Sequence, residues 1–290
     1  ARLLIVLVCS VSMPRMHKLV FNFMGLWVAA LWLSAALPTL ARAEIKTLEV
    51  EYKQGDTPLQ GFIAWDDAVT GKRPGVLIVH EWWGHNQHAR NQAVRVAKAG
   101  FVGFALDMYG KGKVATHPND AKTFMAEASS DFPREKARFD AALAKLKERP
   151  EVDPKKIAAI GYCFGGSVVL DMLRAGETFP LVATFHGALS TKQTIKPGNK
   201  SRVLVLHGAA DPMITAEAVA AFKKEMDGAK VRYELIEYPG VKHSFTNPEA
   251  DKAGVPGLAY DAKTDEASFA AFVKALKEQV GAPAASKQKP

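Results

Sequence analysis

Short apolar runs alternate with longer stretches of helical periodicity from Glu44 onward. Runs rich in Val, Ile, Leu and Phe are typical of buried strands, and amphipathic stretches are typical of helices that cover a sheet. The pattern predicts strands over 48–52, 59–64, 75–80, 101–106, 157–161, 181–185, 203–207 and 231–238, and helices over 86–99, 117–125, 134–149, 167–174, 216–227 and 266–280. The first two strands are expected to be antiparallel, joined at Gly55-Asp56. The alternation that follows predicts an α/β fold, with a mostly parallel sheet covered by helices on both faces.

The first 43 residues follow a different pattern, because they contain no acidic residue and include a long apolar run. Met16-His17-Lys18 gives a basic start, residues 26–37 are apolar, and Ala41-Arg42-Ala43 is a small-residue cleavage site. This arrangement predicts a signal peptide over 16–43, with residues 1–15 as upstream translation outside the folded protein. A membrane anchor is the alternative, although its apolar core would need about 20 residues. We therefore expect an exported protein, periplasmic or secreted, without stable membrane association after cleavage.

Composition places the chain as a whole among ordinary globular proteins, with 48% hydrophobic and 23% charged residues. Residues 44–281 are expected to form one domain, and residues 282–290, rich in Ala, Lys and Pro, a disordered tail. Removing residues 1–43 takes away four basic residues, so 34 Lys and Arg face 30 Asp and Glu and the net charge falls from +8 to +4. No basic run is interleaved with aromatic residues, so nucleic acid is not an expected partner. We expect a monomer.

Cleavage would also remove Cys9 and leave Cys163 as the single cysteine of the mature chain. Cys163 lies in Gly161-Tyr162-Cys163-Phe164-Gly165-Gly166, between a predicted strand and a predicted helix. A Gly-x-nucleophile-x-Gly turn at this place is the nucleophile elbow of α/β-hydrolases, here with Cys where Ser is usual. The helix N-terminus favours thiolate over thiol. A buried structural cysteine in a Gly-rich turn is the alternative interpretation.

Asp211 and His243 each follow a predicted strand, so the chain order is nucleophile, acid, histidine, as in α/β-hydrolase triads. In open α/β sheets the ligand site lies at the carboxyl ends of the strands. His243 would move the thiol proton, and Asp211 would fix the tautomer of His243 and stabilise its imidazolium form. Taken singly, Asp211 before Pro212 is a common turn residue, and a loop histidine is usually just solvated.

Glu81 ends another strand, in His80-Glu81-Trp82-Trp83-Gly84, which would feed the oxyanion-hole loop. The two tryptophans should desolvate this carboxyl group and raise its proton affinity. A salt-bridged loop glutamate is the alternative. His80, Glu81 and His85 do not have the spacing of an H-E-x-x-H zinc helix, so no metal is expected, and no cofactor is implied.

These segments, together with Asp107-Met108-Tyr109-Gly110 and His243-Ser244-Phe245, resemble the signature segments of the dienelactone hydrolase family over residues 44–280. The resemblance implies a Cys-His-Asp triad at Cys163, His243 and Asp211, and a Glu81 that interacts with the thiol and helps generate thiolate. It also implies an oxyanion hole built from the backbone N–H groups of Trp82 and Phe164. Members that cleave dienelactone have an arginine for the substrate carboxylate where this chain has Asn247.

The sequence thus predicts a cysteine hydrolase of esters or lactones, acting through a thioester on a small-molecule substrate. A general carboxylesterase or thioesterase is the alternative within enzymes, and an exported binding protein without turnover is the alternative outside them. The substrate pocket is expected to use Trp83, Tyr109, His186, Phe245 and Asn247, with Trp82, Trp83 and Phe245 as an aromatic wall.

Overall fold

The structure, a computed structural model, describes residues 44–191 and 193–283, and the expected signal peptide, the upstream segment and nearly all of the expected tail lie outside this part. Eight strands are β1 (Ile45–Gln54), β2 (Thr57–Asp66), β3 (Arg73–Val79), β4 (Val102–Leu106), β5 (Val152–Tyr162), β6 (Leu181–Phe185), β7 (Arg202–Gly208) and β8 (Arg232–Tyr238). The α-helices are α1 (Gln87–Lys98), α2 (Pro118–Ser129), α3 (Phe132–Lys147), α4 (Phe164–Arg174), α5 (Ala216–Gly228) and α6 (Ala262–Val280). A short 3₁₀ turn, Ala250–Ala253, follows β8.

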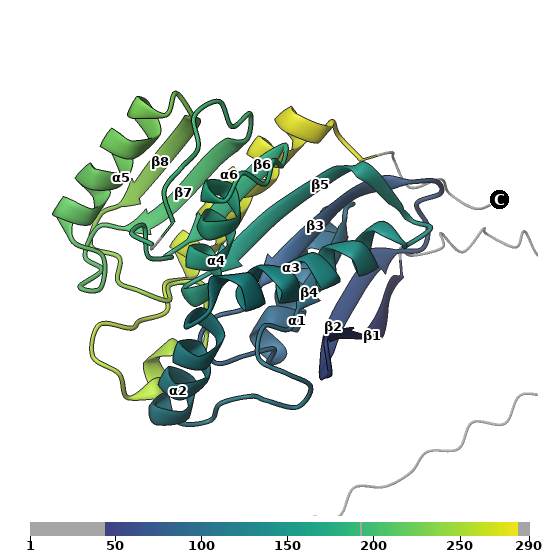
Figure 1. Ribbon diagram of the computed structural model, residues 1–290, viewed down its shortest axis with the longest axis horizontal. Coiled ribbons are helices and arrows are strands. Elements are labelled where there is room, and N and C mark those ends of the chain that lie inside the picture. The colour runs from purple at the N-terminus through teal and green to yellow at the C-terminus, as the bar shows by residue number, and fades with distance from the viewer. Residues whose placement is uncertain (1–43, 192, 284–290) are drawn as a thin grey trace, which may run out of the picture. The chain divides into compact units, whose positions relative to one another are not determined.

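All eight strands form one sheet in the order β1-β2-β4-β3-β5-β6-β7-β8 (Figure 1). The pairs β1·β2 and β2·β4 are antiparallel, and every later pair is parallel. Because β3 to β8 are parallel, their carboxyl ends lie at one edge of the sheet, which is where an α/β protein places its ligand site.

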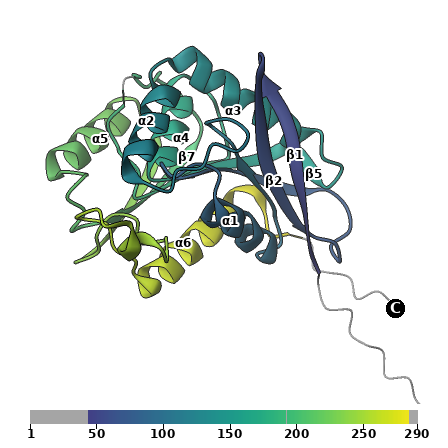
Figure 2. The same cartoon turned by 90° about the horizontal axis from the view of Figure 1, so that it is seen from below.

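Helices cover both faces of the sheet (Figure 2). One apolar cluster joins the sheet to α3, α4 and α5 through residues such as Phe139, Val169 and Phe222. A second cluster joins the other face to α1 and α6 through Val96 and Phe272. All seven residues of β3 are buried, because alternate side chains of this central strand enter the two clusters. The predicted fold class is therefore confirmed.

The largest difference from the predicted elements is at the start of β5, which was expected at Ile157 and begins at Val152. The start of α4 also differs, because this helix was expected at Ser167 and begins at Phe164. Glycine lowers helix propensity, so Gly165 and Gly166 argued against helix. Tertiary packing overrides that preference, because both glycines lie against neighbouring backbone or side-chain atoms with no room for a Cβ. Among the described residues, no helix is both long and apolar enough to cross a membrane.

Candidate active site

Cys163 stands at the junction of β5 and α4, with φ 53° and ψ −115°. An L-residue in this region carries strain of about 1–3 kcal/mol, and such strain persists only where the surroundings hold it. Here the Cys163 N–H donates to the Phe185 carbonyl at 3.0 Å, and the Cys163 carbonyl accepts from Gly166 N–H at 3.0 Å. The turn therefore presents the sulfur at the carboxyl edge of the sheet, at the N-terminus of a helix.

Three glycines make this sharp turn possible. A Cβ on Gly161 would lie 1.9 Å from the Gly165 carbonyl oxygen, and one on Gly165 would lie 2.3 Å from the Val79 carbonyl oxygen. A Cβ on Gly166 would lie 2.2 Å from Thr184 Oγ1. The sequence G-x-C-x-G-G thus brings α4 into backbone contact with β3 and β5, which is the reason for its glycine spacing.

His243 and Asp211 lie on the loops after β8 and β7 and meet through a hydrogen bond of 2.7 Å between His243 Nδ1 and Asp211 Oδ2. Both side chains are buried. Backbone bonds hold the two loops together, because Ala209 N–H and Ala210 N–H donate to the carbonyls of Tyr238 and Val241 at 2.9 Å each. The structure therefore brings together two of the residues that the chain order selected.

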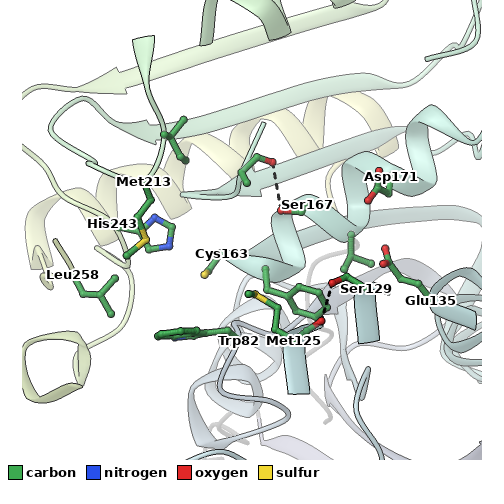
Figure 3. Close-up of a pocket in the computed structure, with 14 residues that line it drawn as sticks. Trp82, Met125, Ser129, Glu135, Cys163, Ser167, Asp171, Met213, His243 and Leu258 are labelled. Carbon is green, nitrogen blue, oxygen red and sulfur yellow. Dashed lines mark hydrogen bonds between the residues drawn. The ribbon is translucent and has the colours of Figure 1, made fainter. Parts of the chain in front are cut away.

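The imidazole of His243 lies at the same cavity as Cys163 (Figure 3), and both Cys163 and Asp211 influence its protonation. Burial lowers the pKa of His243, but the side chains of Cys163 and Asp211 outweigh burial and raise the pKa to about 10. Nδ1 is hydrogen-bonded to Asp211, so Nε2 is the ring nitrogen that can interact with Cys163. A histidine held in this way carries a proton at neutral pH.

Glu81 follows β3 and is 2% exposed, so it is more buried than the predicted loop position suggested. Its Oε1 accepts a hydrogen bond from Ser244 Oγ at 2.7 Å, and its Oε2 accepts one from Asn247 Nδ2 at 2.5 Å. The predicted interaction with the thiol is not among its hydrogen bonds in this structure. The carboxylate instead links the loop after β3 to the loop that carries His243.

Trp82 and Phe164, whose N–H groups were predicted to form the oxyanion hole, line the same cavity as Cys163, and Cys163 is the N-cap of α4. Phe164 is the first residue of α4, and the first N–H groups of a helix have no partner within it. Tyr109 donates its hydroxyl to the Trp82 carbonyl at 3.0 Å, and Ala115 N–H donates to the Trp83 carbonyl at 2.9 Å. These bonds fix the loop; the role of the Trp82 and Phe164 N–H groups remains a prediction.

A cavity of about 310 Å³ opens at Cys163 and His243, a size typical of small-ligand sites (Figure 3). Its walls are mostly apolar, with side chains from α2, α4, the loop after β7 and the segment before α6. The described residues that line it are Trp82, Met125, Ser129, Glu135, Cys163, Phe164, Ser167, Val168, Asp171, Ala188, Met213, Ile214, His243 and Leu258. None of these residues is a lysine or arginine. Burial raises the pKa of Asp171, which lies away from the sulfur (Figure 3).

Five residues expected in the pocket do not line this cavity. Phe245 is fully buried against His186 and Tyr238, and His186 Nε2 bonds to Thr246 Oγ1 at 2.8 Å. Tyr109 lies under the Trp82 loop, and Asn247 bonds to Glu81. Trp83 lines a separate depression with Asn86 and His88. The aromatic wall is thus reduced to Trp82, with Phe164 beside it, because the other rings are used in packing.

Sequence reasoning missed Met125, Met213 and Leu258, which lie on segments far from Cys163 along the chain. No local pattern marks them. Three other lining residues could have been found from their spacing. In a helix that starts at Phe164, the positions Ser167, Val168 and Asp171 lie on the same face as Phe164. Among residues 44–191 and 193–283, no group of three or more histidine, cysteine or carboxylate side chains is arranged to hold a metal ion.

The fold and this strand–Cys–helix turn define an α/β-hydrolase, and comparison with known proteins specifies the family. The model of the dienelactone hydrolase family matches residues 59–280, so the chain belongs to the dienelactone hydrolase family. As a member of this family it is a hydrolase that acts on ester or lactone bonds.

Individual relatives agree with this assignment. "Protein usf" of Aquifex pyrophilus is 30% identical over 223 residues, which cover 73% of this chain and 93% of the relative. A protein of Aquifex aeolicus named "Putative carboxymethylenebutenolidase" is 28% identical, with 73% and 93% coverage. The crystal structure of a dienelactone hydrolase-like promiscuous phosphotriesterase from metagenomic libraries is 36% identical. It has a TM-score of 0.78 and covers 82% of this chain and 99% of that one.

Proposed function

We propose that this hydrolase works through a Cys163–His243–Asp211 triad and a thioester intermediate. The observation that carries the proposal is His243, whose Nδ1 bonds to Asp211 at 2.7 Å while the Cys163 thiol helps to raise its pKa to about 10. The proton that His243 holds at neutral pH is then available for the leaving group. Asp211 keeps the ring in the orientation that the transfer needs and stabilises its charge.

The steps follow from this arrangement. The Cys163 sulfur attacks the carbonyl carbon and forms a C–S bond, and the negative charge on oxygen is held by the Trp82 and Phe164 N–H groups. The tetrahedral adduct collapses, the C–O bond breaks, and His243 gives its proton to the leaving alkoxide. Water then attacks the thioester carbon while His243 takes a proton from the water. The C–S bond breaks, the carboxylic acid leaves, and Cys163 is again a thiolate beside protonated His243. In a lactone, the leaving oxygen remains attached to the product.

We also propose that the substrate is uncharged where it enters the cavity. The described lining is mostly apolar, carries two acidic residues, Glu135 and Asp171, and offers no lysine or arginine. Asn247, at the position where dienelactone-cleaving members have an arginine, bonds to Glu81 outside the cavity lining. An ester or lactone without a carboxylate therefore fits better than the dienelactone itself. A general carboxylesterase or thioesterase would use the same residues.

Phosphotriesters are a second candidate substrate class. The relative described as a promiscuous phosphotriesterase is 36% identical and covers 82% of this chain. A phosphotriester is uncharged, and attack by sulfur on phosphorus displaces an alkoxide or phenolate as attack on carbon does. Hydrolysis of a 4-nitrophenyl dialkyl phosphate, measured beside 4-nitrophenyl butyrate, tests this class with the same chromophore.

The triad is tested by turnover of 4-nitrophenyl butyrate and of simple γ- and δ-lactones. Cys163→Ala is expected to lose essentially all turnover, and iodoacetamide to inactivate the chain with one label per molecule at Cys163. Because the full chain also contains Cys9, Cys9→Ala is the matched control and should behave as the unsubstituted protein. Turnover by Cys163→Ala at the unsubstituted rate would overturn the proposal, and no turnover of any ester, lactone or phosphotriester would favour a binding protein.

We further propose that the protein is exported and cleaved near Ala43, on the basis of the basic start, the apolar run and Ala41-Arg42-Ala43. Protein recovered from the cell envelope should begin at or near Glu44 on N-terminal sequencing. Recovery in membranes with residues 26–37 intact would instead favour the anchor.

A further inference from the structure

His80 is a buried histidine that the proposed mechanism does not use. It follows β3 directly, is 1% exposed, and immediately precedes Glu81 and Trp82. Its ring packs edge-on against Tyr109, with centroids 4.7 Å apart, and lies 6.0 Å from the ring of Phe164. It therefore lies under both segments that are proposed to supply the oxyanion hole.

Both ring nitrogens of His80 are hydrogen-bonded to backbone, and the partners fix the tautomer. Met108 N–H, which can only donate, points at Nε2 from 3.1 Å. The Glu81 carbonyl, which can only accept, lies 2.6 Å from Nδ1. The proton must therefore be on Nδ1, with Nε2 bare. Burial lowers the pKa of His80, so the ring stays neutral as this arrangement requires.

The Glu81 carbonyl and the Trp82 N–H belong to the same peptide group. In a planar trans peptide these two groups point in opposite directions, so an atom that fixes one fixes the other. We propose that His80 is a positioning residue of the oxyanion hole, whose Nδ1–H holds the Glu81–Trp82 peptide so that the Trp82 N–H faces the carbonyl oxygen of the substrate. This inference rests on the proposed function, because it assigns a support to the same site.

Neighbouring contacts show how the orientation of His80 is itself held. Met108 lies in a turn in which Asp107 accepts hydrogen bonds from Tyr109 N–H at 2.8 Å and Gly110 N–H at 2.9 Å. Tyr109 in turn holds the next carbonyl, that of Trp82. A hydrogen bond at a peptide carbonyl also polarises the peptide and strengthens its N–H as a donor. The turn after β4 thus supports the loop after β3 through the His80 imidazole and the Tyr109 hydroxyl, while Gly84 N–H, within the loop itself, also donates to the Glu81 carbonyl at 3.1 Å.

The test compares His80→Leu with His80→Asn. The two side chains are nearly equal in shape, but Asn places an amide donor close to the position of Nδ1, and Leu does not. The oxyanion exists only after attack, so loss of its alignment should lower kcat and leave KM nearly unchanged. Removing an oxyanion donor outright costs roughly 10²–10³-fold in kcat, so a misaligned donor in His80→Leu should cost about 10–10²-fold. His80→Asn should recover a substantial part of that loss.

Alkylation of Cys163 by iodoacetamide separates this role from an effect on the triad or the fold. The reaction needs the nucleophilic sulfur but forms no oxyanion, so its rate should change by no more than about two-fold in His80→Leu. His88→Leu is the control, because His88 is also a buried histidine, packed on Tyr162, with no hydrogen bond to the Trp82 loop. It should retain the kcat of the unsubstituted chain.

Three results would overturn the inference: kcat of folded His80→Leu within about two-fold of the unsubstituted chain, equal kcat for the Leu and Asn variants, or alkylation that falls in step with kcat. If His80→Leu does not fold, His80→Met against His80→Asn gives the same comparison between an apolar side chain and one with an amide near the position of Nδ1. Turnover that does not depend on Cys163 would overturn the proposed function and this inference together. Loss of the His80 effect alone leaves the triad in place.

Discussion

Ser244 Oγ donates a hydrogen bond of 2.7 Å to Glu81 Oε1, although 163 positions separate the two residues along the chain. Asn247 Nδ2 donates to the other carboxylate oxygen. Glu81 is thereby a buried acceptor between the loop after β3 and the loop that carries His243. The same carboxylate joins these two loops and is predicted to act on the Cys163 thiol, so the stability of the loops and the chemistry are linked at this residue.

Replacing Glu81 should therefore affect both folding and rate. Glu81→Ala leaves the donors of Ser244 and Asn247 without their acceptor in a buried place, which costs about 1–3 kcal/mol in the free energy of unfolding. The predicted role of Glu81 in thiolate formation adds a fall in kcat of roughly 10²-fold or more. Urea unfolding and kcat/KM on the same samples measure the two effects.

The matched control is Ser244→Ala, which removes one donor but keeps the carboxylate. It should lose part of the stability and little of the rate. If Glu81→Ala unfolds at the same urea concentration as the unsubstituted chain, the hydrogen bonds described here do not stabilise the loops. If its kcat is unchanged, Glu81 is structural only and the mechanism reduces to Cys163, His243 and Asp211.

Gly165, in the nucleophile elbow, should not tolerate a larger side chain. A Cβ on Gly165 would lie 2.3 Å from the Val79 carbonyl oxygen and 2.7 Å from that of His80, and backbone cannot move aside as a flexible side chain can. Gly165→Ala should cost at least about 1–3 kcal/mol and should reduce turnover, because α4 would be pushed away from β3. Gly228→Ala, with no atom within 4 Å of the added Cβ, should be neutral or slightly stabilising. Equal melting temperatures for the two variants would contradict this account.

The sequence predicted most of the fold because the determinants are local. Buried parallel strands read as continuous apolar runs, and β3, β6 and β7 were located within about one or two residues on that basis. Cys163, Asp211 and His243 each follow a predicted strand, and their order along the chain matches that of a triad. In the structure, Asp211 is hydrogen-bonded to His243. These features depend on periodicity and on glycine placement, which a single sequence contains.

What the sequence could not give depends on packing between distant segments. The partners of Glu81 lie on another loop, and Met125, Met213 and Leu258 reach the cavity from three separate segments. Phe245 and His186 were expected in the pocket because aromatic and histidine side chains after strands often contact ligands. Both side chains are instead buried away from the cavity, where the two rings pack on each other with centroids 5.0 Å apart.

The lining of the cavity predicts a preference for uncharged esters. A carboxylate on the substrate would lie near Glu135 and Asp171, and the described lining has no lysine or arginine to balance it. Partial loss of hydration without a partner is unfavourable for any charge, so kcat/KM should fall by about 10-fold or more when a neutral chain ends in a carboxylate. The pair to compare is 4-nitrophenyl butyrate and mono-4-nitrophenyl succinate, which differ in a terminal methyl against a carboxylate. Asp171→Asn should reduce the difference in kcat/KM between the two esters. Equal kcat/KM for the two esters in the unsubstituted chain would contradict the predicted preference for uncharged substrates.

The protonation of His243 gives a pH dependence with a definite sign. Burial lowers its pKa, but Cys163 and Asp211 raise it to about 10 in the folded chain, above the value of about 6.5 for an unfolded histidine. The resulting stabilisation is complete below about pH 6.5 and is lost as the pH rises through about 10.

The free energy of unfolding of the unsubstituted chain should thus fall relative to that of His243→Gln between about pH 7 and pH 10. Urea unfolding of both chains across this range measures the difference, and titrating groups that do not interact with His243 cancel because they are common to both. NMR titration of the His243 ring should show that Cys163→Ala lowers its pKa, since the thiol is the largest of the influences that raise it. The proposed mechanism requires His243 to be protonated at pH 7. A neutral His243 ring at pH 7 in the unsubstituted chain would contradict it.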